Sequence, residues 1–153
     1  MKSKICGLTD PRETIFLNEA GADYAGFVFY EKSKRNITIA QAEVIREKLN
    51  SEIKRVAVTV APTADFVKTI EGSGFDILQV HKSLDPKLLE MIHIPVWFAI
   101  NIADEMQLRE KTRFLDSLPE RLGNKITAIV VDGAGYGGGE PFDWEKNNEI
   151  RKM

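Results

Sequence analysis

The sequence has little cysteine and no long apolar run. Cys6 is the single cysteine among 153 residues. One thiol excludes an internal disulfide framework and is typical of a reducing compartment. The longest nearly unbroken apolar run, residues 94–100, is far shorter than the roughly 18 residues of a membrane span. No apolar run of signal-peptide length follows Met1. We therefore expect a cytoplasmic protein without a membrane partner.

The sequence also lacks an excess of basic residues. Its 21 Lys and Arg residues against 23 Asp and Glu residues give a formal net charge of −2. Nucleic-acid-binding proteins usually carry a basic patch or stripe, so we predict no nucleic-acid partner. The length suits one domain with a real core, and no low-complexity tract or linker divides the chain. The sequence therefore predicts a single domain over residues 1–153.

Apolar segments recur along the chain with the character of buried parallel strands. Several are apolar throughout rather than alternating, which indicates burial on both faces, as in parallel strands covered by helices. The predicted strands are residues 4–6, 24–29, 55–60, 77–80, 96–100 and 128–131.

Helix signals fill the gaps between these strands. Asp10 is followed by Pro11 and Glu13, and Thr38 is followed by Gln41; both patterns predict a capping box at a helix start. Further helices are expected from residues 63, 86, 104 and 143. Within the fifth helix, the charged run 109–111, which includes Lys111, is predicted to be a solvated face.

This alternation gives six βα units in series, which fits either a doubly wound sheet or a (β/α) barrel. The glycine cluster follows the sixth strand rather than the first, so no dinucleotide-binding fingerprint opens the chain. We therefore favour the α/β class of the (β/α)8 TIM-barrel type. A full barrel needs eight units and typically 200 or more residues, so we expect an incomplete barrel with about six units.

Two residues suited to acid-base chemistry lie where predicted strands end. Cys6 ends the first strand, and Asp132 ends the sixth. The carboxyl ends of parallel strands share one face of an α/β protein, so this thiol and carboxyl group are expected to meet there. A thiolate base and a carboxylic acid would be a pair suited to proton transfer.

Several motifs in one order carry a specific resemblance. They are Lys4-Ile5-Cys6-Gly7-Leu8-Thr9, Gly21-Ala22-Asp23, Gly26-Phe27-Val28-Phe29, Ser33-Lys34-Arg35, Gln79-Val80-His81, and Asp132 followed by Gly137-Gly138 and Phe142-Asp143-Trp144. Each motif alone is weak, but the set closely resembles phosphoribosylanthranilate isomerase, the (β/α)8 enzyme of tryptophan biosynthesis. The likeness covers essentially the whole chain.

The resemblance implies an activity without metal or organic cofactor. It implies the Amadori rearrangement of N-(5-phosphoribosyl)anthranilate, a small phosphorylated substrate. Cys6 would be the general base at C2′, and Asp132 the general acid at the furanose oxygen. Arg35 would meet the anthranilate carboxylate, a role that suits a planar guanidinium. His81 would face the same pocket.

The glycine cluster after Asp132 includes Gly137 and Gly138. Its backbone N–H groups could cradle a substrate phosphate, or the segment could be a loop above the site. No Gly-Lys-Ser/Thr sequence follows, which argues against a nucleoside-triphosphate loop.

The resemblance also exposes a departure from the family. The family usually continues through a seventh and an eighth βα unit, whose loops bind the substrate phosphate. With six units, the first and sixth strands would keep unpaired edges, through which the chain could self-associate. The alternative function is therefore a catalytically inactive member of the family that acts as an assembly or interaction module.

Overall fold

The computed structural model describes residues 2–82, 84–101 and 105–132. Their strands form one parallel sheet, in the order β1-β2-β3-β4-β5-β6. The strands are β1 (Lys4–Cys6), β2 (Tyr24–Phe29), β3 (Lys54–Thr59), β4 (Ile77–Val80), β5 (Val96–Asn101) and β6 (Ile126–Asp132).

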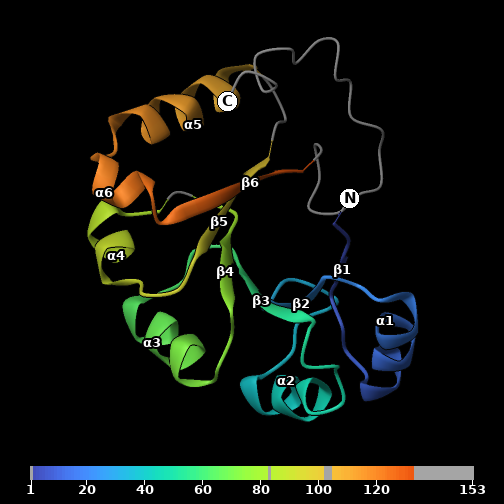
Figure 1. The fold of residues 1–153 in the computed structure, drawn as a ribbon. Helices are drawn as coiled ribbons and strands as arrows, with labels where there is room; N and C mark the ends of the chain where they lie inside the picture. Colours follow the sequence, from blue (N-terminus) through green and yellow to red (C-terminus); the bar gives the residue numbers. More distant parts are fainter. Residues whose placement is uncertain (1, 83, 102–104, 133–153) are drawn as a thin grey trace.

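The strand order decides between the two folds that the sequence allowed. A doubly wound sheet reverses its strand order at a switch point. Here each strand pairs with the next one in the chain, without reversal. Figure 1 shows the resulting curved sheet with the helices along its convex side. This arrangement is an open half-barrel, and it confirms the predicted incomplete barrel of six strands.

The helices connect successive strands. They are the 3-10 helix η1 (Pro11–Glu13), α1 (Thr14–Ala20), α2 (Ile39–Arg46), α3 (Ala64–Gly72), α4 (Pro86–Met91), α5 (Glu105–Ser117) and α6 (Glu120–Gly123). The sequence did not predict α6, which starts directly after Pro119. A proline after a helix usually indicates only that the helix has ended. The helix expected from residue 143 lies outside the described residues.

The predicted capping boxes form and set where two of these helices begin. The Asp10 carboxylate accepts a hydrogen bond from the backbone of Arg12, and the Glu13 carboxylate accepts one from the backbone of Asp10. Thr38 and Gln41 make the corresponding exchange at the start of α2. Each cap satisfies N–H groups that the first helical turn leaves without partners.

The hydrophobic core has two parts, one on each face of the sheet. The larger part lies between the sheet and the helices, and includes Phe27, Leu78 and Phe98, all at most 1% exposed. The smaller part lies on the other face, where Val56 and Val58 pack near Cys6 and Trp97. Side chains two positions apart on a strand share one face, so residues two positions beyond a member of this smaller cluster also lie on the concave side.

The prediction of a solvated charged face on α5 is wrong for Lys111. Its ammonium donates hydrogen bonds to the carbonyl oxygens of His81, at 3.0 Å, and Ala99, at 3.1 Å. It also lies 5.0 Å from the centre of the Phe98 ring. Burial lowers the pKa of Lys111, while Glu110 opposes that shift. The methylene groups of Lys111 therefore lie along the core, and its ammonium binds carbonyl oxygens at the ends of strands. The pattern of residues along the helix could not predict these contacts, because they come from other elements.

Candidate active site

Strand ends bring four of the predicted site residues to one cavity. Cys6, Arg35, His81 and Asp132 line a hollow of about 270 Å³ on the concave side of the sheet. The rest of its lining is Lys4, Val28, Tyr30, Ser33, Val58, Thr59, Val60, Gln79, Val130 and Val131. The other two predicted residues, Gly137 and Gly138, lie outside the described residues.

A chain of polar contacts crosses the cavity from β1 to β6. The Lys4 ammonium donates a hydrogen bond to Oε1 of Gln79. Nε2 of Gln79 lies 2.8 Å from Nε2 of His81. Nδ1 of His81 in turn lies 4.0 Å from Oδ2 of Asp132. The two side chains that could exchange protons with a substrate, Cys6 and Asp132, thus lie in a connected polar environment.

Lys4 lies two positions before Cys6 and lines the same cavity. Burial lowers the pKa of Lys4, and the neighbouring Cys6 side chain opposes that shift by charge attraction and hydrogen bonding. The ammonium also lies 5.7 Å from the centre of the Trp97 ring, whose face attracts cations. Tyr24 packs edge-on against the same ring, at 4.7 Å between centroids.

Arg35 lies at the rim and is held by contacts from two sides. Its Nη1 donates a hydrogen bond of 2.9 Å to the carbonyl oxygen of Cys6. Its backbone N–H donates to Oγ of Ser33 at 3.1 Å. The side chain is exposed, and a guanidinium has five N–H donors in a fixed plane. The arrangement can therefore present a planar cationic edge to a carboxylate that enters the cavity.

Lys4 and Gln79 also line the cavity, but the sequence pattern did not predict them as site residues. Each lies two positions before a predicted site residue, Cys6 or His81, and lines the same cavity. Side chains two positions apart on a strand point to the same face. Polar residues at that spacing within otherwise apolar strands were the signal that could have found them.

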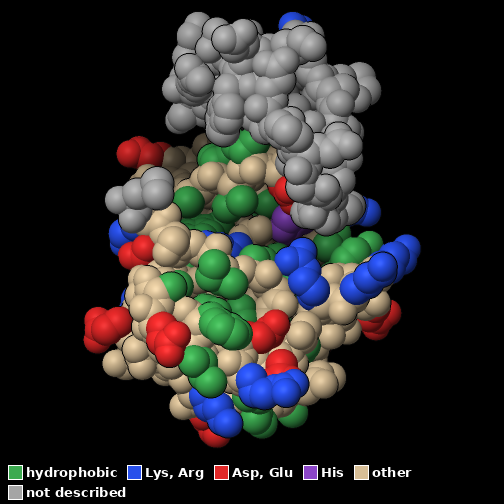
Figure 2. Space-filling view, turned by 90° about the vertical axis from the view of Figure 1, so that its right-hand side faces the viewer, with side chains coloured by type: hydrophobic (Ala, Val, Ile, Leu, Met, Phe, Trp, Pro, Cys, Tyr) green, Lys and Arg blue, Asp and Glu red, His purple; other side chains and the backbone are tan. Residues whose placement is uncertain are grey.

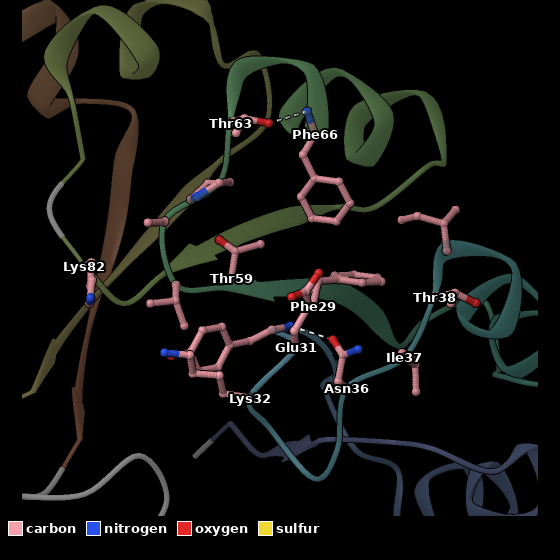
Figure 3. A pocket seen from close by; sticks show the side chains of 15 residues that line it. Phe29, Glu31, Lys32, Asn36, Ile37, Thr38, Thr59, Thr63, Phe66 and Lys82 are labelled. Carbon is pink, nitrogen blue, oxygen red and sulfur yellow. Dashed lines mark hydrogen bonds between the residues drawn. The ribbon is translucent and has the colours of Figure 1, made fainter.

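A larger cavity of about 720 Å³ adjoins the first at the ends of β2 and β3. It shares Tyr30, Thr59 and Val60 with the smaller cavity. In Figure 3 the Phe66 ring points from α3 toward Thr59 and Phe29, and Lys32 and Lys82 lie at one side. Neither Cys6 nor Asp132 lines this cavity, so it lacks the two groups predicted for proton transfer.

The surface of the described part carries both signs of charge. On the face shown in Figure 2, acidic and basic side chains are interspersed with hydrophobic ones. Among the described residues, no helix is long and apolar enough to cross a membrane. Within those same ranges, no three His, Cys, Asp or Glu side chains are grouped to hold a metal ion.

Comparison with protein families gives a match over nearly the whole chain. The family described as N-(5'phosphoribosyl)anthranilate (PRA) isomerase matches residues 3–153. The N-(5'-phosphoribosyl)anthranilate isomerase of Streptococcus mutans is 33% identical over 146 residues, which are 95% of this chain and 68% of that protein. The protein of the same name from Citrifermentans bemidjiense is 35% identical over 150 residues, covering 94% of this chain and 68% of the relative. The chain thus spans about two thirds of the length of these relatives.

Solved structures agree with this match. The phosphoribosyl anthranilate isomerase of Thermotoga maritima superposes with a TM-score of 0.81 at 28% identity, covering 99% of this chain and 72% of that one. A phosphoribosyl anthranilate isomerase in complex with reduced 1-(o-carboxyphenylamino)-1-deoxyribulose 5-phosphate gives a TM-score of 0.78 at 27% identity. It covers 99% of this chain and 71% of that one.

Proposed function

This chain belongs to the N-(5'-phosphoribosyl)anthranilate isomerase family, and we propose that it catalyses the Amadori rearrangement of N-(5-phosphoribosyl)anthranilate. The product would be 1-(2-carboxyphenylamino)-1-deoxyribulose 5-phosphate. The observation that carries the proposal is that Cys6 from β1 and Asp132 from β6 line one cavity. Arg35 and His81 line it too, so the base, the acid and a carboxylate-binding group share one space.

The proposed chemistry divides the proton transfers between two groups. Asp132 donates a proton to the furanose oxygen as the ring opens and the C1′–nitrogen bond becomes a protonated imine. The Cys6 thiolate then removes the proton from C2′, which the imine has made acidic, and an enolamine forms. The enolamine tautomerises to the ketone. A thiolate suits the second step because its pKa can be matched to neutral pH.

Arg35 is the proposed partner of the carboxylate on the substrate's anthranilate ring. Its Nη1 is anchored to the Cys6 carbonyl oxygen, which fixes the guanidinium next to the base. An anthranilate carboxylate bound there would orient the ribose-derived carbon atoms toward Cys6 and Asp132. Holding reactant and catalytic group in such geometry supplies much of the rate enhancement of an enzyme.

The relative solved with the reduced deoxyribulose 5-phosphate compound indicates the class of ligand. We propose that the substrate of this chain is likewise phosphorylated, and that Gly137 and Gly138 contribute backbone N–H groups to it. The single thiol must stay reduced to act as a base, so we propose a cytoplasmic location.

Loss of substrate fluorescence tests the proposed activity directly. The purified chain should consume phosphoribosylanthranilate, and Cys6→Ser and Asp132→Asn should each abolish turnover. His93→Gln, which changes the only other histidine of the chain at a position paired with Glu71 outside the cavity, should retain it. An absence of turnover in the unmodified chain even at high protein concentration would contradict the proposal.

The alternative is an assembly module, and one observation favours it. Among the described residues, β1 pairs only with β2, and β6 only with β5. Ile5 on β1 is 49% exposed, and Phe16 on α1 is 70% exposed. Unpaired strand edges beside exposed apolar side chains are sites where another chain can add. We propose a second copy of this chain as that partner.

A further inference from the structure

Resting on the proposed isomerase function, we propose that Lys4 is a positioning residue for both catalytic groups. Its ammonium favours the thiolate form of Cys6. Through Gln79, it also fixes the tautomer of His81 that faces Asp132.

The first part rests on the closeness of Lys4 and Cys6 over one point of the sheet. Both side chains lie on the same face of β1, two positions apart. Gly26 is the strand partner of Cys6 on β2. A β-carbon at Gly26 would lie 2.7 Å from Sγ of Cys6 and 3.1 Å from Cε of Lys4. Sγ of Cys6 and Cε of Lys4 therefore both occupy the space beside Gly26 that a larger residue would fill.

A cation beside a cysteine side chain stabilises the thiolate form. Neighbouring lysine or arginine groups lower the pKa of a cysteine thiol, and a partly water-excluded site strengthens the effect. Lys4 is held in place from its other sides by Gln79 and by the Trp97 ring. The ammonium thus stays beside the sulfur rather than extending into water.

Other titratable and charged groups face the thiol from the surrounding strands and loops. They are Tyr30 and Arg35 after β2, His81 after β4 and Asp132 on β6. Arg35 adds positive charge but donates its hydrogen bond to the Cys6 carbonyl oxygen. Once Asp132 has given up its proton, its negative charge opposes the thiolate. Lys4 is therefore the cation whose removal should change the thiol most.

The second part follows from which groups can donate a hydrogen bond. An ammonium has only N–H donors, so the oxygen of the Gln79 amide must face Lys4. The amide nitrogen then faces Nε2 of His81 and donates to it. A ring nitrogen that accepts carries no proton, so neutral His81 must carry its proton on Nδ1. Nδ1 is the nitrogen 4.0 Å from Oδ2 of Asp132.

This tautomer matters for the acid. An N–H that points at Asp132 can orient its carboxyl group and stabilise the carboxylate left after the proton has gone to the substrate. With the opposite tautomer, a lone pair would face the carboxylate instead. Lys4, which lies beside Cys6, is thus connected to Asp132 through the side chains of Gln79 and His81.

Alkylation of Cys6 tests the first part without requiring turnover. Cys6 is the only thiol of the chain, so the rate of modification by iodoacetamide, followed by intact mass across pH, reports its ionisation alone. Lys4→Met should slow alkylation at neutral pH up to roughly tenfold, because the cation beside the sulfur is lost. Lys4→Arg should stay close to the unmodified chain. Lys2→Met, which removes an exposed lysine two positions before β1, is the matched control.

The tautomer of His81 tests the second part in the unmodified chain. Ring ¹⁵N chemical shifts at neutral pH should show a neutral imidazole protonated on Nδ1. Gln79→Met should shift the population toward the Nε2-protonated form. An Nε2-protonated His81 in the unmodified chain, or an alkylation profile that Lys4→Met leaves unchanged, would overturn the proposal. Both measurements are independent of isomerase turnover, so an inactive chain would contradict the proposed function and leave these results interpretable.

Discussion

The Arg35 side chain crosses directly above Gly7. A β-carbon at Gly7 would lie 2.8 Å from Nε and 2.8 Å from Nη1 of Arg35, which is closer than real side chains pack. Gly7 also has a φ of +90°, a conformation that residues with a side chain rarely adopt. A glycine after Cys6 therefore lets the backbone turn at the end of β1 and lets the guanidinium reach the Cys6 carbonyl oxygen.

Replacing Arg35 by lysine should weaken binding of the carboxylate-bearing ligand. Lysine keeps the charge but loses the planar pair of donors. We expect about tenfold weaker binding of reduced 1-(o-carboxyphenylamino)-1-deoxyribulose 5-phosphate, measured by calorimetry, since tenfold corresponds to about 1.4 kcal/mol. Lys34→Met, at the neighbouring exposed position outside the cavity, should bind as the unmodified chain does. Equal affinities for Arg35→Lys and the unmodified chain would show that Arg35 does not hold the carboxylate.

A side chain at Gly26 should displace the thiol of Cys6. An added β-carbon would lie 2.7 Å from Sγ and 3.1 Å from the backbone Cα of Cys6, so the strand itself must shift. We expect Gly26→Ala to lower the free energy of unfolding by about 1–3 kcal/mol and to abolish turnover. Urea unfolding and the fluorescence assay measure the two effects.

Gly72→Ala is the control for this substitution, because beyond its chain neighbours and its own helix backbone no atom would lie within 4 Å of the new β-carbon. It lies at the end of α3, where alanine should stabilise or leave stability unchanged. If Gly26→Ala proved as stable and as reactive toward iodoacetamide as Gly72→Ala, the close packing of β1 on β2 would not matter for the site.

Asp76 should contribute stability that is lost in acid. Burial alone would raise its pKa, but hydrogen bonds from the side chain and backbone of Arg55 outweigh burial and lower it. Because the folded pKa lies below the usual value of about 3.9, this contribution is complete above that value and is lost as the pH falls through the folded pKa.

We expect Asp76→Asn to cost about 1–2 kcal/mol near neutral pH, because the carboxylate is partly exposed. Urea unfolding at several pH values checks this. The difference between Asp76→Asn and the unmodified chain should shrink as the pH falls below about 4. A difference that stayed constant with pH would show that the ion pair with Arg55 is not its source.

A charge next to the edge of β1 that no other described strand pairs with should reduce self-association. Ile5 is 49% exposed on this strand, and lysine at strand edges is a common way to block edge-to-edge pairing. We expect the unmodified chain to sediment as a concentration-dependent oligomer and Ile5→Lys to sediment as a smaller species. Val44→Lys on α2, where the valine is 51% exposed, is the matched control. An unmodified chain that is monomeric at all concentrations would contradict the prediction.

The sequence by itself determined most of the local structure and the placement of the two catalytic candidates. Continuous apolar segments indicated all six strands, with β3 beginning one residue earlier and β6 two residues earlier than expected. Capping residues such as Asp10 and Thr38 marked helix starts correctly. These features depend on neighbours along the chain, which is why a one-dimensional pattern can predict them.

Only the tertiary structure decided which side chains meet across the sheet. Neighbouring strands lie about 4.8 Å apart, so in a flat sheet β1 and β4 would be roughly 14 Å apart and β4 and β6 roughly 10 Å apart. Yet Lys4 hydrogen-bonds to Gln79, and His81 lies 4.0 Å from Asp132. The curvature of the sheet, together with long side chains on its concave side, closes these gaps. Curvature arises from the packing of all the helices and strands together, so no single segment of sequence encodes it.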